Sequence, residues 1–237
     1  GLVQPSYPSL AALLRQLHAI EGSQRIRFLT SHPNWFSDEL LGALAELPKL
    51  MPHIELPVQA GSDRVLTAMR RGYTAEQFVK LVEKIRARLG EIAFATDLIV
   101  GFPGETEKDF EQSLQVLRVT HPDMTHAARY SPRPGTLSAR SMADDVPENE
   151  KWRRFREVER LQETISTEIN SANLGRVVPV LFEGKSKARW FGRTPSNKVG
   201  FAESQQDPRG SSLQVKINWT GPWSLVGNLV QDEEVNR

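Results

Sequence analysis

Up to residue 130, the spacing of apolar residues alternates between short runs, which are typical of β-strands, and the three-to-four-residue spacing of helices. Short apolar runs predict four β-strands, at 25–29, around Ile54, at 92–100 and at 124–130. Helical spacing predicts helices over 10–20, 38–47, 63–69, 75–89 and 107–119. Four strand and helix repeats favour an incomplete parallel, TIM-like barrel of α/β class, because a closed barrel usually needs about 250 residues.

Two of these strands lead directly into loops of small residues. Residues 60–62 follow the strand around Ile54, and residues 101–104 follow the strand that ends at Val100. Ligands of parallel α/β sheets bind at the carboxyl ends of the strands. We therefore expect a site in the loops after Gln59 and after Val100.

The pattern changes near residue 150. Residues 137–149 are polar and acidic and predict a connector, and 150–173 predict one charged helix, which Gly175 ends. From Arg176 onward, short alternating runs separated by turn residues predict a small antiparallel, all-β barrel. The expected division is into a barrel part, residues 1–149, a connecting helix, residues 150–174, and a small β domain, residues 175–237.

Composition excludes few classes of protein. The chain has 39% apolar and 25% charged residues, which is typical of globular proteins. It has no cysteine, so it can form neither disulfides nor thiolate metal sites. No apolar run approaches the roughly 18 residues of a membrane span, so we expect a soluble, cytoplasmic chain without a membrane partner. The first residue is Gly rather than Met, which suggests a piece of a longer protein.

The net charge of +1 hides a basic segment. Residues 151–200 contain eleven Lys and Arg against five Glu. Phosphate contacts supply most sequence-independent affinity for nucleic acids, so this excess suggests an anionic partner. A solvated helix face without a partner explains the same charges equally well.

Three long segments resemble the radical-SAM methylthiotransferases that modify tRNA. They are LPVQAGSDRVLTAMRRGYT (56–74), TDLIVGFPGETEKDF (96–110) and YSPRPGT (130–136), and the resemblance extends from about residue 10 to residue 230. It implies the C-terminal part of a radical-SAM barrel, followed by a TRAM domain that binds RNA. The complete enzyme would add a methylthio group to C2 of N6-isopentenyladenosine next to the anticodon of tRNA.

The resemblance also implies cofactors. The complete enzyme would use S-adenosylmethionine and two 4Fe-4S clusters, whose cysteines precede everything present here in family members. This chain is therefore expected to bind no iron or cofactor alone, to be inactive alone, and to need the missing N-terminal part of its own polypeptide. No histidine has ligand spacing with another histidine or an acidic residue, so no metal site is predicted.

By resemblance, the strand and loop around Val100 would contact the adenine, the segment after Val58 would line the ribose and methionine part, and Arg133 would face a carboxylate or the substrate. The expected cofactor residues are Gln59, Ser62, Asp97, Ile99, Val100, Gly101, Phe102 and Arg133. No catalytic residue is assigned within the chain.

Structural alternatives remain open for several of these positions. Ser62 could only cap the helix that starts at Asp63, and Arg133 could form an interdomain salt bridge. Gln59 and Asp97 could only hydrogen-bond neighbouring loops. Three further residues are ambiguous in the same way: Arg70 and Arg71, which could be a solvated helix end, and His32 in the segment TSHP.

The small β domain carries the expected RNA contacts. Its candidate phosphate contacts are Lys185, Lys187, Arg189, Arg193 and Lys198. Strand alternation allows only one of Trp190 and Phe191 to point outward and stack on a base, while the other joins the core. The expected RNA partner is the anticodon stem-loop of tRNA.

Three rival functions remain. Relatives in the same family act on threonylcarbamoyl-adenosine or on an aspartate of a ribosomal protein. A non-catalytic RNA-binding protein could use a decayed barrel only to present the basic domain. A phosphate-binding barrel enzyme would need a basic set of loops, of which only Arg133 is evident in the sequence.

Overall fold

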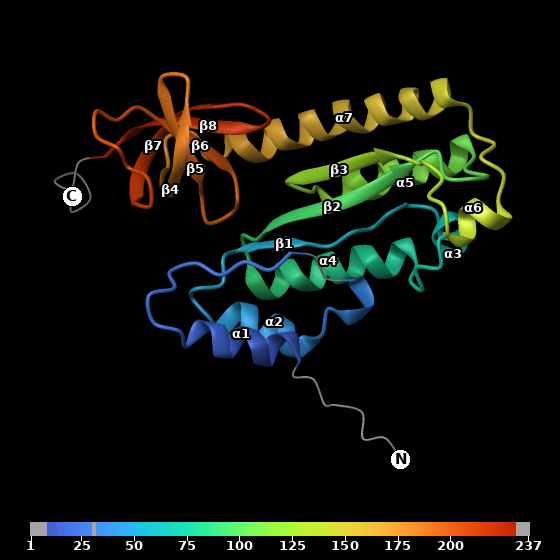
Figure 1. The fold of residues 1–237 in the computed structure, drawn as a ribbon, viewed down its shortest axis with the longest axis horizontal. Coiled ribbons are helices and arrows are strands. Elements are labelled where there is room, and N and C mark those ends of the chain that lie inside the picture. The colour runs from blue at the N-terminus through green and yellow to red at the C-terminus, as the bar shows by residue number, and fades with distance from the viewer. Residues whose placement is uncertain (1–8, 30–31, 231–237) are drawn as a thin grey trace, which may run out of the picture.

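A computed structural model describes residues 9–29 and 32–230 (Figure 1). A parallel sheet with its helices lies at one end, a small barrel lies at the other, and one long helix joins them (Figure 1). The helices of the described part are α1 (Leu10–His18), the 3-10 turn η1 (Pro33–Trp35), α2 (Asp38–Glu46), α3 (Asp63–Ala68), α4 (Ala75–Leu89), α5 (Glu107–Thr120), α6 (Leu137–Ser141) and α7 (Glu148–Ser171). No helix in this part of the chain is long and apolar enough to cross a membrane.

The first sheet is parallel, as predicted. Its strands are β1 (His53–Glu55), β2 (Ala93–Val100) and β3 (Met124–Arg129), in the order β1-β2-β3. The chain after β1 stays beside β2, because the Gln59 N–H donates to the Asp97 carbonyl oxygen at 2.9 Å and Gln59 forms a single bridge with Leu98. The carboxyl ends of β2 and β3 and the position of Gln59 therefore share one edge.

The prediction of a fourth strand at 25–29 is wrong for the described residues. This segment forms only one isolated bridge, between Ile26 and Leu50. Arg25 and Arg27, on either side of Ile26, extend to the small barrel: Arg25 donates to the Arg193 carbonyl oxygen at 2.9 Å, and Arg27 to the Thr194 carbonyl oxygen at 2.6 Å. The segment therefore connects the two parts of the chain, because its side chains face the barrel.

Helix starts follow the capping residues in the sequence. Thr74 and Gln77 form a reciprocal capping box at the start of α4, and Thr106 and Asp109 form one at the start of α5. Such boxes satisfy backbone N–H groups that a helix leaves without partners, and a cap stabilises by about 1 kcal/mol. The boxes set where α4 and α5 begin, and a shared core that includes Phe78, Phe94 and Phe110 packs these helices on the sheet.

α7 departs from its prediction in its start and its buried face. It begins at Glu148, and the expected connector before it contains α6. Val158 and Ile165 are buried as expected, but Trp152 is 40% exposed. Five polar residues of α7 are buried instead: Lys151, Arg154, Gln162, Ser166 and Asn170. Lys151 and Arg154 contact the segments after β3 and β2, Gln162 and Ser166 contact the start of β3, and Asn170 contacts the barrel turn at Gly221 and Pro222. The helix therefore presents a polar face to both parts of the chain.

The C-terminal part is a closed five-stranded β-barrel with the order β4-β5-β6-β8-β7. Its strands are β4 (Val177–Ser186), β5 (Arg189–Arg193), β6 (Val199–Ala202), β7 (Ser212–Thr220) and β8 (Ser224–Leu229). The prediction of a purely antiparallel barrel is wrong in one pair, because β6 and β8 are parallel. A five-stranded ring cannot alternate direction throughout, so one neighbouring pair must be parallel. Trp190 is the core member of the Trp190–Phe191 pair.

Candidate functional site

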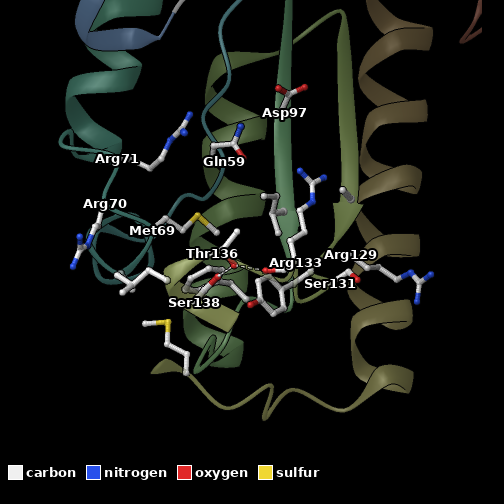
Figure 2. A pocket seen from close by; sticks show the side chains of 17 residues that line it. Gln59, Met69, Arg70, Arg71, Asp97, Arg129, Ser131, Arg133, Thr136 and Ser138 are labelled. Atoms are coloured by element: carbon white, nitrogen blue, oxygen red, sulfur yellow. Dashed lines mark hydrogen bonds between the residues drawn. The ribbon is translucent and has the colours of Figure 1, made fainter. Parts of the chain in front are cut away.

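A cavity of about 650 Å³ opens at the carboxyl edge of the parallel sheet (Figure 2). Its floor is formed by β2 and β3, and its walls by the turn after α3 and by the segment that follows β3. The residues that line it are Gln59, Ala68, Met69, Arg70, Arg71, Asp97, Ile99, Phe102, Ala128, Arg129, Tyr130, Ser131, Arg133, Thr136, Leu137, Ser138 and Met142. Its volume is in the range of small-molecule pockets, which are about 300–1,000 Å³.

The three resembling segments meet at this cavity. Gln59 comes from the first, Asp97, Ile99 and Phe102 from the second, and Arg133 from the third. These five of the eight expected cofactor residues therefore share one site. Ser62, Val100 and Gly101 do not line it.

Gln59 has an uncommon backbone conformation. Its φ is +69°, in the left-handed region that residues other than glycine rarely adopt. Its N–H and C=O groups are both bound to β2, at Asp97 and Ile99, so the sheet holds this conformation. Backbone strain of this kind costs about 1–3 kcal/mol and concentrates at functional sites. The sheet thereby fixes the backbone of Gln59, whose side chain lines the cavity.

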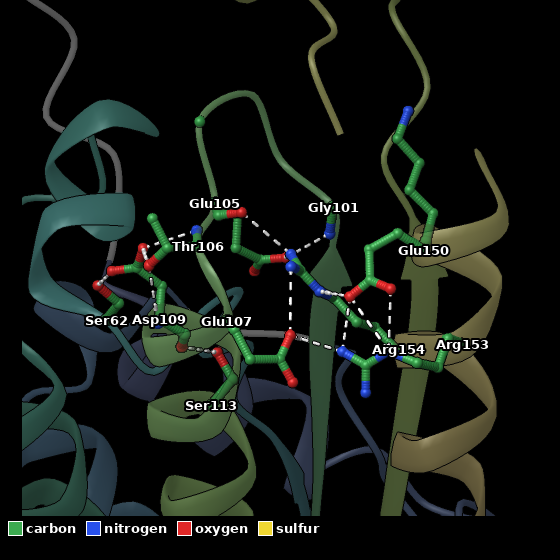
Figure 3. Close-up of polar contacts among 12 residues, drawn as sticks. Ser62, Gly101, Glu105, Thr106, Glu107, Asp109, Ser113, Glu150, Arg153 and Arg154 are labelled. Atoms are coloured by element: carbon green, nitrogen blue, oxygen red, sulfur yellow. Dashed lines mark hydrogen bonds and ion pairs between the residues drawn. The ribbon is translucent and has the colours of Figure 1, made fainter. Parts of the chain in front are cut away.

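Ser62 does not cap α3 through its side chain, so that structural alternative is wrong. Its hydroxyl group donates to Asp109 Oδ1 at 2.5 Å (Figure 3). Burial alone would raise the pKa of Asp109, but hydrogen bonds from Arg64, Ser62 and Thr106 outweigh it and hold that pKa well below its usual range. Ser62 thus belongs to a polar cluster that joins the loop to α5.

Gly101 is packed under α7. Its N–H donates to Glu105 Oε2 at 2.6 Å, and a Cβ atom at this position would lie 2.4 Å from Cγ of Lys151 (Figure 3). Its φ of +73° also favours glycine. The N–H of Gly101 is therefore occupied within the protein. An adenine contact at Gly101 and Val100 stays a prediction.

Glu105 and Arg154 form a buried ion pair that the sequence analysis missed. Arg154 Nη1 lies 2.8 Å from Glu105 Oε2, and the two side chains are 5% and 0% exposed (Figure 3). Burial raises the pKa of Glu105 above its ordinary value, although hydrogen bonds from Gly101 and Arg154 act in the opposite direction. The pair binds the loop after β2 to α7.

Neighbouring charges extend this pair. Arg154 Nε also donates to Glu150 at 3.0 Å, and Arg153 donates to Glu150 at 2.6 Å and to Glu107 at 2.5 Å (Figure 3). Hydrogen bonds from Arg153, together with the charges of Arg153 and Arg154, lower the pKa of Glu150 to about 2. The first turn of α5 is thus joined to the second turn of α7 by charge-assisted hydrogen bonds.

His32 takes a structural position. Its Nδ1 accepts a hydrogen bond from the Asn34 N–H at 3.3 Å, and its ring lies 5.5 Å from the ring of Tyr73 in an edge-on arrangement. Burial, with the nearby charge of Arg71, lowers the pKa of His32. His32 is not among the residues that line the cavity.

The expected RNA contacts divide into two groups. Lys185, Lys187 and Arg189 are exposed on and beside the turn between β4 and β5. Lys198 instead pairs with Asp123 at 2.5 Å, and its side chain is only 13% exposed. Arg193 donates to the Asn197 carbonyl oxygen at 3.1 Å. Lys198 thus joins the barrel to the segment before β3, and RNA contacts at all five positions stay a prediction.

Comparison with known proteins finds similarity at two levels, to a superfamily and to individual enzymes. Residues 2–117 match the Radical SAM superfamily. This matched segment, just under half of the chain, is thus similar to radical SAM proteins. It is also 48% identical over 97% of its length to the tRNA-2-methylthio-N(6)-dimethylallyladenosine synthase of Roseiflexus sp. (strain RS-1) and covers 49% of that protein.

Two further relatives of this chain have the same name. The synthase of Chloroflexus aurantiacus is 47% identical over 98% of the chain, which covers 50% of that protein. The synthase of Dehalococcoides mccartyi (strain CBDB1) is 48% identical over 95% of the chain, which covers 54% of that protein. The chain therefore spans about half the length of the curated relatives it matches.

Proposed function

We propose that this chain is the C-terminal part of a tRNA methylthiotransferase, which adds a methylthio group to C2 of N6-isopentenyladenosine next to the anticodon. The observation that carries the proposal is the meeting of the three resembling segments at one cavity on the carboxyl edge of the sheet. The names of the three relatives support this substrate, and none of them names a threonylcarbamoyl-adenosine or a ribosomal protein.

The residues of the cavity fit S-adenosylmethionine. Ile99 and Phe102 offer apolar surface to a nucleobase, Gln59 offers its side-chain amide, and Arg133 offers a planar cation for a carboxylate. When bound, this cofactor supplies the transferred methyl group and the source of the radical chemistry. The chain's own residues hold and orient it, and the walls of the cavity limit the access of water.

The residues of this chain do not fit an iron-sulfur cluster. Such clusters are held by cysteine thiolates, and the chain has no cysteine. Within residues 9–29 and 32–230, no group of three His, Asp or Glu residues is placed to hold a metal ion either. The clusters of the proposed enzyme would be bound by the remainder of its polypeptide.

The β-barrel is proposed to be a TRAM domain that binds the anticodon stem-loop. Its exposed cations, Lys185, Lys187 and Arg189, are suited to phosphate contacts. We propose the boundaries 1–149 for the radical-SAM part, 150–174 for the connecting helix and 175–237 for the TRAM domain. The interface in which Arg27 and Lys198 take part holds the two parts together.

Nucleoside mass spectrometry tests the proposed function. The complete polypeptide that contains this chain is expressed in a bacterial host that lacks its own methylthiotransferase but still makes isopentenylated tRNA. We expect 2-methylthio-N6-isopentenyladenosine to appear in the tRNA, and to be absent when the host cannot add the isopentenyl group. Methylthiolation of threonylcarbamoyl-adenosine or of a ribosomal protein, with the isopentenylated tRNA unchanged, would contradict the proposal.

A further inference from the structure

Positively charged side chains outnumber carboxylates around the cavity. Four arginines line it, Arg70, Arg71, Arg129 and Arg133, whereas Asp97 is the only carboxylate among the described lining residues. Such an excess of positive charge in a cavity attracts anions.

One of these arginines is already neutralised. Arg129 forms an ion pair with Glu148, and its guanidinium group lies 3.7 Å from the ring centre of Trp152 on α7. In Figure 2 its side chain extends away from the cavity. Among residues 9–29 and 32–230, no carboxylate forms an ion pair with Arg70, Arg71 or Arg133. Three guanidinium groups therefore remain for a ligand.

The backbone holds Arg70 and Arg71 at one rim of the cavity. Arg70 has a φ of +57°, which only a tight turn imposes on a residue of this size. The Arg70 N–H donates to the Thr67 carbonyl oxygen at 2.9 Å, and the Arg71 N–H to the Leu66 carbonyl oxygen at 3.0 Å. The turn after α3 therefore fixes the backbone of both arginines. A strained backbone of this kind is often found at functional sites.

Arg71 is also fixed through its side chain. Its Nε donates to the hydroxyl group of buried Tyr73 at 3.3 Å, and that hydroxyl group donates to the Val58 carbonyl oxygen at 2.9 Å. Val58 directly precedes Gln59 in the cavity wall. The contact leaves both terminal nitrogens of Arg71 available for an anion.

The three arginines without carboxylate partners lie on opposite sides. Figure 2 shows Arg70 and Arg71 on one side of Gln59 and Asp97, and Arg133 on the other; Arg70 points outward from the rim. If Arg133 binds the carboxylate of the cofactor, as proposed above, Arg70 and Arg71 remain for a second anion. That anion must lie at the rim, because Arg70 does not point into the cavity.

We infer that Arg70 and Arg71 bind the backbone phosphates on either side of the target adenosine. The base would enter the cavity while its phosphates stay outside, where guanidinium groups can contact their oxygens with two hydrogen bonds each. This inference rests on the proposed function only in taking the substrate nucleoside to be part of an RNA chain.

Salt dependence of RNA binding tests the inference. The affinity of the 237-residue chain for a synthetic anticodon stem-loop RNA is measured over a series of salt concentrations. Each lost phosphate contact on single-stranded RNA reduces the slope of log K against log salt by about 0.7. We expect this reduction in Arg70→Gln and in Arg71→Gln, and about twice as much in the double variant. Arg71→Lys, which keeps the charge, should retain the slope.

Arg88→Gln is the matched control. Arg88 is exposed at the end of α4 that lies away from the cavity, so its removal should leave the slope unchanged. Wild-type slopes in Arg70→Gln and Arg71→Gln would overturn the inference and leave the proposed function standing. Failure of the wild-type chain to bind the RNA at all would count against both.

Discussion

Replacing Arg154 by alanine is expected to lower the free energy of unfolding by about 3–5 kcal/mol, because Glu105 would stay buried without its cation. Both side chains are at most 5% exposed, so water cannot replace the lost partner without opening the loop after β2. Urea denaturation followed by circular dichroism measures the change. Arg160→Ala is the matched control, since Arg160 is exposed on the same helix and should change stability by no more than about 0.5 kcal/mol.

The pH dependence of this loss gives an independent check. Burial raises the pKa of Glu105 above the ordinary value of 4.5, so the folded state binds that proton more tightly than the unfolded state. The contribution of Glu105 to stability is therefore fully present below pH 4.5 and is lost as pH rises through the raised pKa. Without Arg154 the pKa rises further. The deficit of Arg154→Ala should thus shrink as pH falls from 7 toward 5.

A double variant separates the pair from simple packing. Arg154→Met with Glu105→Gln removes both charges and keeps most of the volume, so much of the stability should return. If Arg154→Ala cost less than about 1 kcal/mol at pH 7, the pair would not be the buried contact described above.

Gly61→Ala is expected to destabilise the fold by about 1–3 kcal/mol or more through overpacking. A Cβ atom there would lie 2.4 Å from the Gln112 carbonyl oxygen and 2.5 Å from Cα of Ser113, both in the backbone of α5. The backbone of a helix cannot yield as a flexible side chain can. The Gly61 N–H also donates to Ser113 Oγ at 2.8 Å, and a shift of the loop would break this bond.

Gly42→Ala should stabilise the fold, in contrast to Gly61→Ala. Gly42 lies inside α2, and the nearest atom to its added Cβ is Glu46 Oε1 at 3.8 Å. Alanine favours a helix interior over glycine by about 0.5–1 kcal/mol, so this variant should be slightly more stable. The midpoint of thermal unfolding is measured for both variants and for the wild-type chain. Equal midpoints for both would show that Gly61 does not pack against α5 as described.

Features set by neighbours in the sequence were predicted well. The starts of α4 and α5 follow from Thr74 and Thr106, because a cap acts within one helical turn. The barrel follows from alternating runs and turn residues. The meeting of Gln59, Ile99 and Arg133 follows from the rule that the carboxyl ends of parallel strands share an edge.

Features set by distant partners were not predicted. Arg154 is buried because Glu105, 49 positions away, supplies its counter-charge. The 25–29 segment makes one isolated bridge to Leu50, and its Arg25 and Arg27 bind carbonyl groups of the barrel, more than 160 positions away. Ser62 binds Asp109 rather than capping α3, since four donor groups converge on that carboxylate. None of these pairings has a signal in local spacing.

The central claim is that the cavity at the carboxyl edge of the parallel sheet binds S-adenosylmethionine. Locating the bound cofactor tests this claim most directly. The complete polypeptide is labelled with a photoreactive azidoadenine analogue of the cofactor, and the labelled peptides are identified by mass spectrometry. The cavity predicts label within 97–102 or 128–136 that excess S-adenosylmethionine suppresses. Suppressible label confined to the barrel, residues 177–229, would contradict the account.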